Sequence, residues 1–281
     1  LFAARALSKV GVRLKGKLMI ESVIGEEDGG VGTLAAVLRG YKADGAIVVE
    51  PTNLAVVPTQ AGALNFRVTI PGRSAHGSVR NQGISAIEKF IPIYAALMGL
   101  ERDRNQAVRE PLLARYSQPY PICVGKIQGG DWASTVAERL TFEGRYGVAV
   151  GEDIPTARRL LEKTVAQAAN SDSWLREHPP HVQWWGGQFE PASIATDHLL
   201  VKKLSAAYDT AAGAPARVEG VPYGADMRLL VNEGQTPTVL FGPGDVGNAH
   251  MPDEFVPIAD LVTVVRTLAL TALHFCGYQE S

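Results

Sequence analysis

The sequence has 281 residues, of which 46% are hydrophobic and 20% charged, so it can bury a sizeable core and is not a disordered chain. The net charge of −2 argues against nucleic acid or an anionic membrane bound through bulk charge, and no apolar run approaches the roughly 18 residues of a membrane span. The two cysteines, Cys123 and Cys276, form no spaced motif and favour a reducing compartment, so we expect a cytoplasmic protein.

The first elements alternate between helix and strand. Residues 1–10 are typical of the end of an amphipathic helix, 17–24 of a buried strand, 31–39 of a helix and 45–50 of a second apolar strand. Continuous apolar strands separated by a helix favour a parallel sheet covered on both faces. Because the chain begins in the middle of such an α/β unit, we expect it to be part of a longer polypeptide.

The pattern changes near residue 60. The strand 62–70 alternates, and it places four apolar side chains on one face: Leu64, Phe66, Val68 and Ile70. The expected elements that follow are a helix over 84–101, strands over 122–127 and 139–148, a helix over 154–169 and a strand over 181–185. This β-α-β-β-α-β order is that of a split ferredoxin-like domain. In its last strand we expect one ring of Trp184 and Trp185 to pack inward.

The α/β pattern resumes near residue 188. Helices are expected over 197–211, 225–232 and 258–274, with a strand over 236–242. The simplest architecture is a mostly parallel-sheet α/β domain interrupted by an inserted ferredoxin-like α+β domain. We therefore predict one domain from 1–59 and 188–281, with the insertion at 60–187.

Polar residues follow several of the predicted strands, where open α/β sheets bind their ligands. They are Glu26, Glu27 and Asp28 after the first strand, Glu50 after the second, the pair Asp226 and Arg228, and His250 near the C-terminus. Carboxylates with an imidazole are the ligand set of zinc, manganese or cobalt hydrolases. Each feature alone also fits a structural role, such as a solvated turn or a surface histidine. Adjacent strand residues face opposite ways, so we expect the strand to end near Gly25 and both glutamates to lie on the turn beyond it.

Six segments carry a family resemblance, in this order: ESVIGEEDGG, VVEPTNL, GRSAHGSVRNQGISAIEK, GGDWAST, GADMRLL and FGPGDVGNAHMPDE. The set resembles the dinuclear zinc metallopeptidase and deacylase family of acetylornithine deacetylase, succinyl-diaminopimelate desuccinylase, aminoacylase-1 and carboxypeptidase G. The resemblance covers essentially the whole chain. It implies an α/β catalytic domain with an inserted lid that makes a homodimer contact, and two zinc or cobalt ions in the complete protein.

The resemblance also implies roles for individual residues. Glu26 matches the general base, Glu27 and His250 match ligands of one metal, and Glu50 matches a ligand of the other. His76 matches the lid histidine that reaches a neighbouring subunit's active site, although it also fits a histidine of a flexible loop. In such a site a divalent metal acidifies water, a carboxylate transfers its proton to the leaving amine, and a histidine donor stabilises the oxyanion.

Two arginines are candidates for binding a substrate carboxylate, because guanidinium pairs bidentately with carboxylate. They are Arg228 and Arg145, and each fits a structural ion pair equally well. We expect Asp226 to orient its surroundings. The segment GGDWAST departs from the family, which commonly has Asn and Pro there, and Ser134 or Thr135 can take the polar role of the Asn.

A larger departure is that no H-x-D motif occurs in the sequence. In the family this motif supplies a first metal ligand, a bridging Asp follows it, and both precede the strand before the paired glutamates. We therefore expect the 281 residues alone to bind metal weakly and to be inactive. The expected function is metal-dependent hydrolysis of N-acyl amino acids or related small amides. The alternatives are an aminopeptidase or dipeptidase on the same metal centre, and a metal-poor binding or oligomerisation protein on the same fold.

Overall fold

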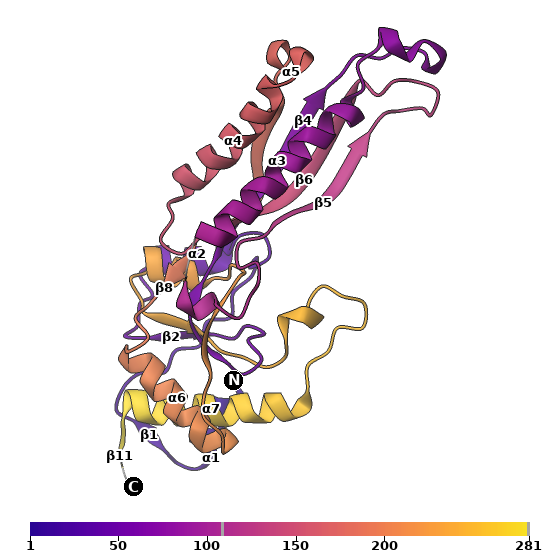
Figure 1. The fold of residues 1–281 in the computed structure, drawn as a ribbon. Coiled ribbons are helices and arrows are strands. Elements are labelled where there is room, and N and C mark those ends of the chain that lie inside the picture. Colours follow the sequence, from indigo (N-terminus) through magenta and orange to yellow (C-terminus); the bar gives the residue numbers. More distant parts are fainter. Residues whose placement is uncertain (108–109, 280–281) are drawn as a thin grey trace. The chain divides into compact units, whose positions relative to one another are not determined.

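The computed structural model describes residues 1–107 and 110–279, which divide into two compact units (Figure 1). Unit 1 comprises Leu1–Gln60 and Ala192–Ser281, and unit 2 comprises Ala61–Pro191. The chain therefore leaves unit 1 once and returns to it once. Each unit has its own sheet and its own hydrophobic core.

Unit 2 is built on a four-stranded antiparallel sheet in the order β5-β6-β4-β7. Its strands are β4 (Gly62–Pro71), β5 (Ile122–Gly129), β6 (Arg139–Val148) and β7 (His181–Phe189), and its long helices are α3 (Ala86–Ala107) and α4 (Ile154–Asn170). Both helices run along the same face of the sheet (Figure 1). Short helices complete the unit: η1 (Gly77–Gln82), η2 (Pro111–Leu113) and α5 (Ser173–Glu177). The predicted β-α-β-β-α-β order is confirmed.

The core of unit 2 lies between this sheet and its helices. The four alternating side chains of β4 are fully buried there, as the period of two predicted: Leu64, Phe66, Val68 and Ile70. Trp184 packs edge-on against Phe66, with ring centroids 6.3 Å apart. Trp185 points to the opposite, polar face, where the guanidinium of Arg67 lies 4.4 Å from its ring centroid. One of the two neighbouring tryptophans therefore packs inward, as expected.

Helix α3 continues past residue 101, where the sequence predicted its end, to Ala107. Its charged last turns suggested a loop, yet Glu101 and Arg104 are buried. Glu101 accepts a hydrogen bond from the Ile122 N–H at 2.6 Å, and Arg104 donates two hydrogen bonds to Glu152 at 2.9 and 2.6 Å. These partners, distant in sequence, satisfy the charges and allow the helix to continue.

Unit 1 contains a mixed five-stranded sheet with the order β2-β10-β3-β8, in which β9 also pairs with β3. Its strands are β2 (Ala46–Val48), β3 (Val56–Gln60), β8 (Ala192–Ser193), β9 (Val218–Val221) and β10 (Thr238–Leu240). The pairs β2–β10 and β3–β9 are parallel, and β3 is antiparallel to β10 and β8. Helices α6 (Leu199–Ala212) and α7 (Ile258–Cys276) pack on each other and on this sheet. The α/β class is confirmed.

The remaining elements of unit 1 are short. They are α1 (Phe2–Lys9), α2 (Val31–Leu38), η4 (Val246–Asn248) and a two-stranded sheet of β1 (Arg13–Leu14) and β11 (Tyr278–Gln279). Among the described residues, only helix α7 is long and apolar enough, by length and composition, to cross a membrane. Mostly buried core helices of soluble proteins pass the same test, whereas 28% of this stretch of α7 is buried, including Val264 and Ala272.

One sequence prediction for unit 1 is wrong and another is met in an unusual form. Residues 17–24 form no strand, and most of their apolar side chains are exposed, Ile24 by 79%. No described strand pairs with this segment, so its backbone has no ladder to join. The helix predicted over 225–232 is present, but most of it is π-helical. The backbone turns at Asp226, is α-helical at Met227 and Arg228, and continues as the π-helical turn η3 (Leu229–Glu233), which closes with the Gly234 N–H donating to the Leu229 carbonyl at 2.8 Å.

Candidate active site

Glu26 and Glu27 lie on a tight turn, not on a strand. The Gly29 N–H donates to the Glu26 carbonyl at 2.9 Å, and the Gly30 N–H donates to the Gly25 carbonyl at 2.8 Å. Gly25 has a φ of 71°, a left-handed conformation that glycine adopts without strain. The chain thus reverses immediately before helix α2, and the alternation of a strand does not constrain the two carboxylates.

The turn is held in place by Asp226, which precedes η3. A Cβ on Gly30 would lie 2.1 Å from Asp226 Oδ1, so only glycine fits at this close approach. Thr33 Oγ1 donates a 2.5 Å hydrogen bond to Asp226 Oδ2, and both side chains are buried. Asp226 therefore orients its surroundings, as expected from the sequence. The sequence reasoning missed Thr33 and Gly30, because their contacts join segments 193 residues apart.

Arg228 is a second link between η3 and the turn. Its guanidinium donates a 2.8 Å hydrogen bond to the Gly29 carbonyl, and the side chain is buried. This contact gives Arg228 a structural role in holding the loop that carries Glu26 and Glu27. Binding of a substrate carboxylate by Arg228 stays a prediction.

His250 lies beside Glu27, and its Nε2 is 3.3 Å from Glu27 Oε1. Both side chains are 77% exposed, so solvent reaches the pair. The backbone of His250 has a φ of 60°, which is uncommon for a residue with a Cβ and is concentrated at functional sites. The Glu254 carboxylate accepts a 3.1 Å hydrogen bond from the His250 N–H and stabilises this conformation.

Glu26 and Glu50 lie close enough to other acidic side chains for those charges to shift their pKa values. Burial, followed by the charges of Asp226 and Glu27, raises the pKa of Glu26 to about 6, against the opposing effect of Arg228 and His250. Burial, followed by the charges of Glu26, Asp226 and Glu27, raises the pKa of Glu50 to about 7. The charges of Glu26, Glu27, Glu50 and Asp226 therefore influence one another, in surroundings with an excess of negative charge.

The position of Glu50 is fixed by the loop that follows β2. Thr52, which is buried, accepts a 3.1 Å hydrogen bond from the Gly242 N–H and donates one to the Ala55 carbonyl at 2.8 Å. A Cβ on Gly242 would lie 2.4 Å from the Glu50 carbonyl, so the two loops approach as closely as backbone allows. Thr52 was not predicted as part of the site, because nothing in the sequence shows that a threonine after a strand will contact the loop of Gly242.

The side chains of this site can be compared with the ligands that a divalent cation requires. Carboxylate oxygen and imidazole nitrogen are suitable ligands, and a cation beside Glu27 and His250 would neutralise the charges that raise the pKa values of Glu26 and Glu50. Asp226 Oδ1 is buried and has no hydrogen-bond partner among the described residues. The chemical groups of these residues therefore suit a divalent metal ion. In number they supply two ligands to one ion, since no group of three or more His, Cys, Asp or Glu side chains comes together in the part of the chain that the structure describes.

The other predicted residues, His76 and Arg145, lie in unit 2. His76 precedes η1 and is exposed, and its Nδ1 accepts a 3.2 Å hydrogen bond from the Ser78 N–H. In the neutral imidazole this acceptor role at Nδ1 leaves the proton on Nε2. Arg145 lies on the polar face of the sheet, between Asn65 and Cys123 of the neighbouring strands. Burial lowers its pKa from the ordinary arginine value.

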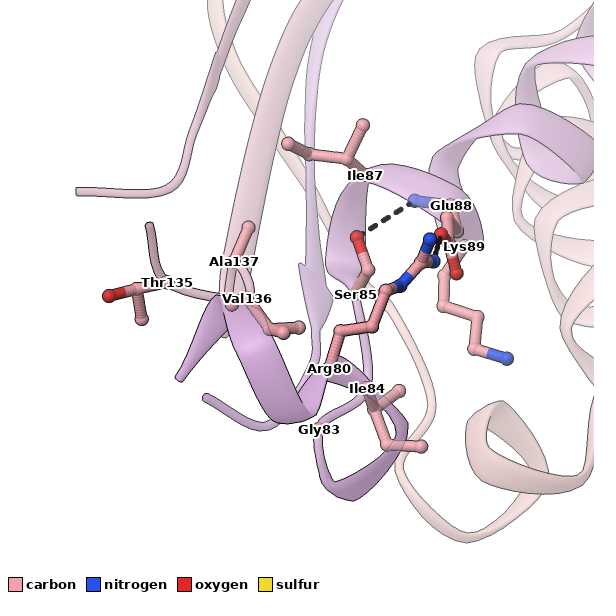
Figure 2. Close-up of a pocket in the computed structure, with 11 residues that line it drawn as sticks. Arg80, Gly83, Ile84, Ser85, Ile87, Glu88, Lys89, Thr135, Val136 and Ala137 are labelled. Atoms are coloured by element: carbon pink, nitrogen blue, oxygen red, sulfur yellow. Dashed lines mark hydrogen bonds and ion pairs between the residues drawn. The ribbon is translucent and has the colours of Figure 1, made fainter. Parts of the chain in front are cut away.

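The His76 loop borders a shallow cavity of about 300 Å³ in unit 2 (Figure 2). Arg80 extends across it and pairs with Glu88, and Ser85 Oγ accepts from the Glu88 N–H at 3.4 Å. Thr135, Val136 and Ala137 line its opposite side. The loop that carries His76 and the loop between β5 and β6 therefore share one surface.

An α/β unit with carboxylates and a histidine on loops beside its sheet is typical of hydrolases. The model of Peptidase family M20/M25/M40 matches residues 1–274, and the chain belongs to this family. Members are hydrolases of amide bonds in small molecules and peptides, and the family resemblance of the sequence is confirmed.

Two relatives illustrate the range of the family. The N-formyl-4-amino-5-aminomethyl-2-methylpyrimidine deformylase of Halalkalibacterium halodurans is 30% identical over 299 residues, which cover 100% of this chain and 69% of the relative. The acetylornithine deacetylase of Myxococcus xanthus is 29% identical over 267 residues, which cover 94% of this chain and 67% of the relative.

Solved structures share the fold at lower identity. The M20 family metallo-carboxypeptidase Sso-CP2 from Sulfolobus solfataricus has a TM-score of 0.72 at 16% identity, and the match covers 97% of this chain and 74% of that one. Human carnosine dipeptidase 1 has a TM-score of 0.69 at 12% identity, with 98% and 70% covered. At these identities the likeness shows the fold alone.

Proposed function

We propose that this protein hydrolyses the amide bond of an N-acyl amino acid or a related small amide. The observation that carries the proposal is the arrangement of Glu27 and His250, 3.3 Å apart, beside two carboxylates with raised pKa values. A hydrolase needs a site for an electrophilic cation and a base next to it, and this cluster supplies ligand types for the first and a carboxylate for the second.

The proposed cofactor is a pair of zinc or cobalt ions. Glu27 and His250 would hold one ion and Glu50 the other, because these side chains carry suitable donor atoms. When bound, such ions acidify water and polarise the substrate carbonyl. The manganese ion suits the same donors, so metal identity is part of the experiment below.

Glu26 is the proposed general base. Its carboxylate is not part of the Glu27–His250 pair, and its pKa of about 6 is close to neutral pH. A group that both accepts and returns a proton works best when its pKa lies near the working pH. Glu26 would take a proton from the attacking water and return it to the leaving amine.

His76 is the proposed donor to the oxyanion. Because its Nδ1 accepts from the Ser78 N–H, its free Nε2–H can donate to a developing negative charge. Arg145 is the second polar residue of unit 2 proposed to contact substrate, as a partner for a carboxylate group. Arg228 is proposed for the same role in unit 1, in addition to its contact with the Gly29 carbonyl.

A homodimer through unit 2 is also proposed. Strand β5 is an edge of its sheet, and Ile87, Ile91 and Tyr94 form an exposed apolar stripe on α3 next to it. Free edges and apolar stripes are the usual ingredients of subunit contacts. Replacing Ile91, which is 62% exposed, by Asp should shift the particle mass in light scattering from dimer to monomer. The matched change at the exposed Val10 of unit 1 should leave the mass unchanged.

A second candidate substrate follows from the relatives. Two deformylases of an N-formyl aminopyrimidine, at 30% and 29% identity, are matched over 100% of this chain. We therefore propose N-formyl amides of heteroaromatic amines beside N-acetyl amino acids. The peptidase alternative rests on likeness of fold alone. The reducing cytoplasm is the proposed location, in line with the free thiols of Cys123 and Cys276.

The experiment is a substrate panel on the full-length polypeptide loaded with zinc, cobalt or manganese. It compares N-acetyl, N-succinyl, N-formyl and N-carbamoyl amino acids, N-formyl-4-amino-5-aminomethyl-2-methylpyrimidine, and dipeptides with a free amine. Hydrolysis of one N-acyl class is the expected result. Turnover of the dipeptides alone would replace the proposal by a peptidase, and turnover of none would favour a binding or oligomerisation protein.

A further inference from the structure

Trp132 is an exposed aromatic residue in a loop that contacts the loop of His76, a proposed catalytic group. It lies in the loop between β5 and β6, and 67% of its surface is exposed. The other described tryptophans of the chain contact neighbouring side chains: Trp174 stacks on His178, Trp184 contacts Phe66, and Trp185 contacts Arg67. Leaving an indole ring in water is unfavourable, and exposed tryptophans are enriched at binding surfaces.

The loop of Trp132 is fixed to the loop of His76 by backbone contacts. Thr135 forms an antiparallel bridge with His76, the Gly77 N–H donates to the Ser134 carbonyl at 2.7 Å, and the Val136 N–H donates to the Ala75 carbonyl at 2.9 Å. A Cβ on Gly77 would lie 2.9 Å from the Ser134 carbonyl oxygen, so the contact requires glycine. The strand segment that returns from the Trp132 turn also faces the His76 loop across the cavity in Figure 2.

These contacts limit the distance between Trp132 and His76. The Thr135 N–H donates to the Trp132 carbonyl at 3.0 Å, which closes a turn between these two residues. The ends of such a turn lie within about 7 Å of each other, and bridged antiparallel residues have Cα atoms about 5 Å apart. The two Cα atoms are therefore no more than about 12 Å apart, which places both residues on one small surface.

We propose that Trp132 is a specificity-determining residue that stacks on a planar heteroaromatic ring in the amine part of the substrate. The inference rests on the proposed function, because it requires His76 to face the scissile amide. An indole face binds a flat heterocycle through dispersion and gains a cation–π contribution if that ring or its amine is protonated. The substrate class is thus an N-formyl or N-acyl derivative of a heteroaromatic amine, in preference to one of an aliphatic amino acid.

The test compares two substrates with variants of the full-length, metal-loaded polypeptide. The substrates are N-formyl-4-amino-5-aminomethyl-2-methylpyrimidine and N-acetylornithine. Stacking of one ring contributes about 1–3 kcal/mol, so Trp132→Ala should raise KM for the pyrimidine about 5- to 150-fold. Its kcat should change less than about twofold, because the ring is bound equally in the ground and transition states. Trp132→Phe should recover most of the affinity, and Trp185→Ala is the matched control in the same unit.

A second readout separates this inference from the proposed function. Calorimetric binding of the free amine, 4-amino-5-aminomethyl-2-methylpyrimidine, needs no hydrolysis. If wild-type protein cleaves no amide but binds this ring in a manner that Trp132→Ala abolishes, the proposed function fails and the ring site stands. If Trp132→Ala alters both substrates equally, alters neither, or converts a dimer to a monomer in light scattering, Trp132 has no role in ring specificity and the inference is overturned.

Discussion

The carboxylate of Glu27 lies 3.3 Å from Nε2 of His250, although 223 residues separate the two in the chain. Glu27 stands on the turn before α2, and His250 follows η4. The Gly30–Asp226 approach and the Thr33–Asp226 hydrogen bond hold the turn, and Glu254 holds the His250 backbone. The pair is therefore built from three distant segments of unit 1, which is the reason for treating it as a site.

The first prediction concerns metal affinity. Because only Glu27 and His250 come together as ligands for one ion among the described residues, the 281-residue chain should bind zinc weakly. His250→Ala and Glu27→Gln should each lower the affinity about tenfold or more, since even groups that only orient a ligand contribute about 10- to 100-fold. Titration calorimetry measures the effect. His274→Ala, at an exposed position of α7, is the control, and an unchanged affinity of the His250 variant would rule out its role as a ligand.

The second prediction concerns the close approach of Gly30 to Asp226. Both Gly30 and Gly40 have positive φ, 75° and 83°, but a Cβ meets Asp226 at the first and nothing within 4 Å at the second. Gly40→Ala should therefore cost only the backbone strain, about 1–2 kcal/mol of unfolding free energy. Gly30→Ala adds overpacking and should cost about 2–5 kcal/mol in urea denaturation. Equal losses would show that the Gly30–Asp226 contact relaxes freely.

The fold of unit 2 could be predicted from the sequence because the patterns that determine it lie within short segments. Alternation in β4 predicted the buried face of Leu64, Phe66, Val68 and Ile70, and the order of helices and strands predicted the ferredoxin-like arrangement. The end of α3 was missed, since Glu101 and Arg104 are polar by type but buried through partners elsewhere in the chain. Periodicity carries no information about such partners.

The site could be predicted only in part, because contacts between segments distant in the chain leave no local pattern. The turn at Glu26 and Glu27 was predicted because adjacent residues of a strand face opposite ways, and residue types suggested a metal. By contrast, the strand expected over 17–24 depends on a neighbouring strand to pair with, which an apolar run cannot specify. Thr33 and Thr52 could not be predicted as site residues either, since each is defined by a contact with a segment about 190 residues away. The π-helical form at Leu229 is a local feature that residue types do not distinguish from an α-helix.

The third prediction concerns the pH dependence of the stability of unit 2. Burial raises the pKa of Asp172, but the hydrogen bond from Lys89 at 2.5 Å and the one from the Leu175 N–H outweigh it, so the net pKa lies below the ordinary value. A lowered pKa in the folded state stabilises above the unfolded pKa of about 3.9, and the contribution is lost as pH falls through the folded pKa.

Asp172→Asn should therefore reduce the free energy of unfolding at pH 7 more than at pH 2.5, with the difference appearing below about pH 4. Urea denaturation at several pH values measures it. The exposed Asp253→Asn serves as the control at a distant loop. A loss for Asp172→Asn that is independent of pH would mean that the Lys89 ion pair does not affect stability.

The most direct measurement for the proposed mechanism is turnover by Glu26→Gln in the full-length polypeptide, with metal content measured on the same sample. Gln keeps the shape of the side chain but accepts no proton, so kcat should fall by about 10²–10⁴-fold while bound metal is unchanged, because Glu27, Glu50 and His250 remain. Turnover within a few-fold of wild type at full metal content would contradict the assignment of Glu26 as the general base.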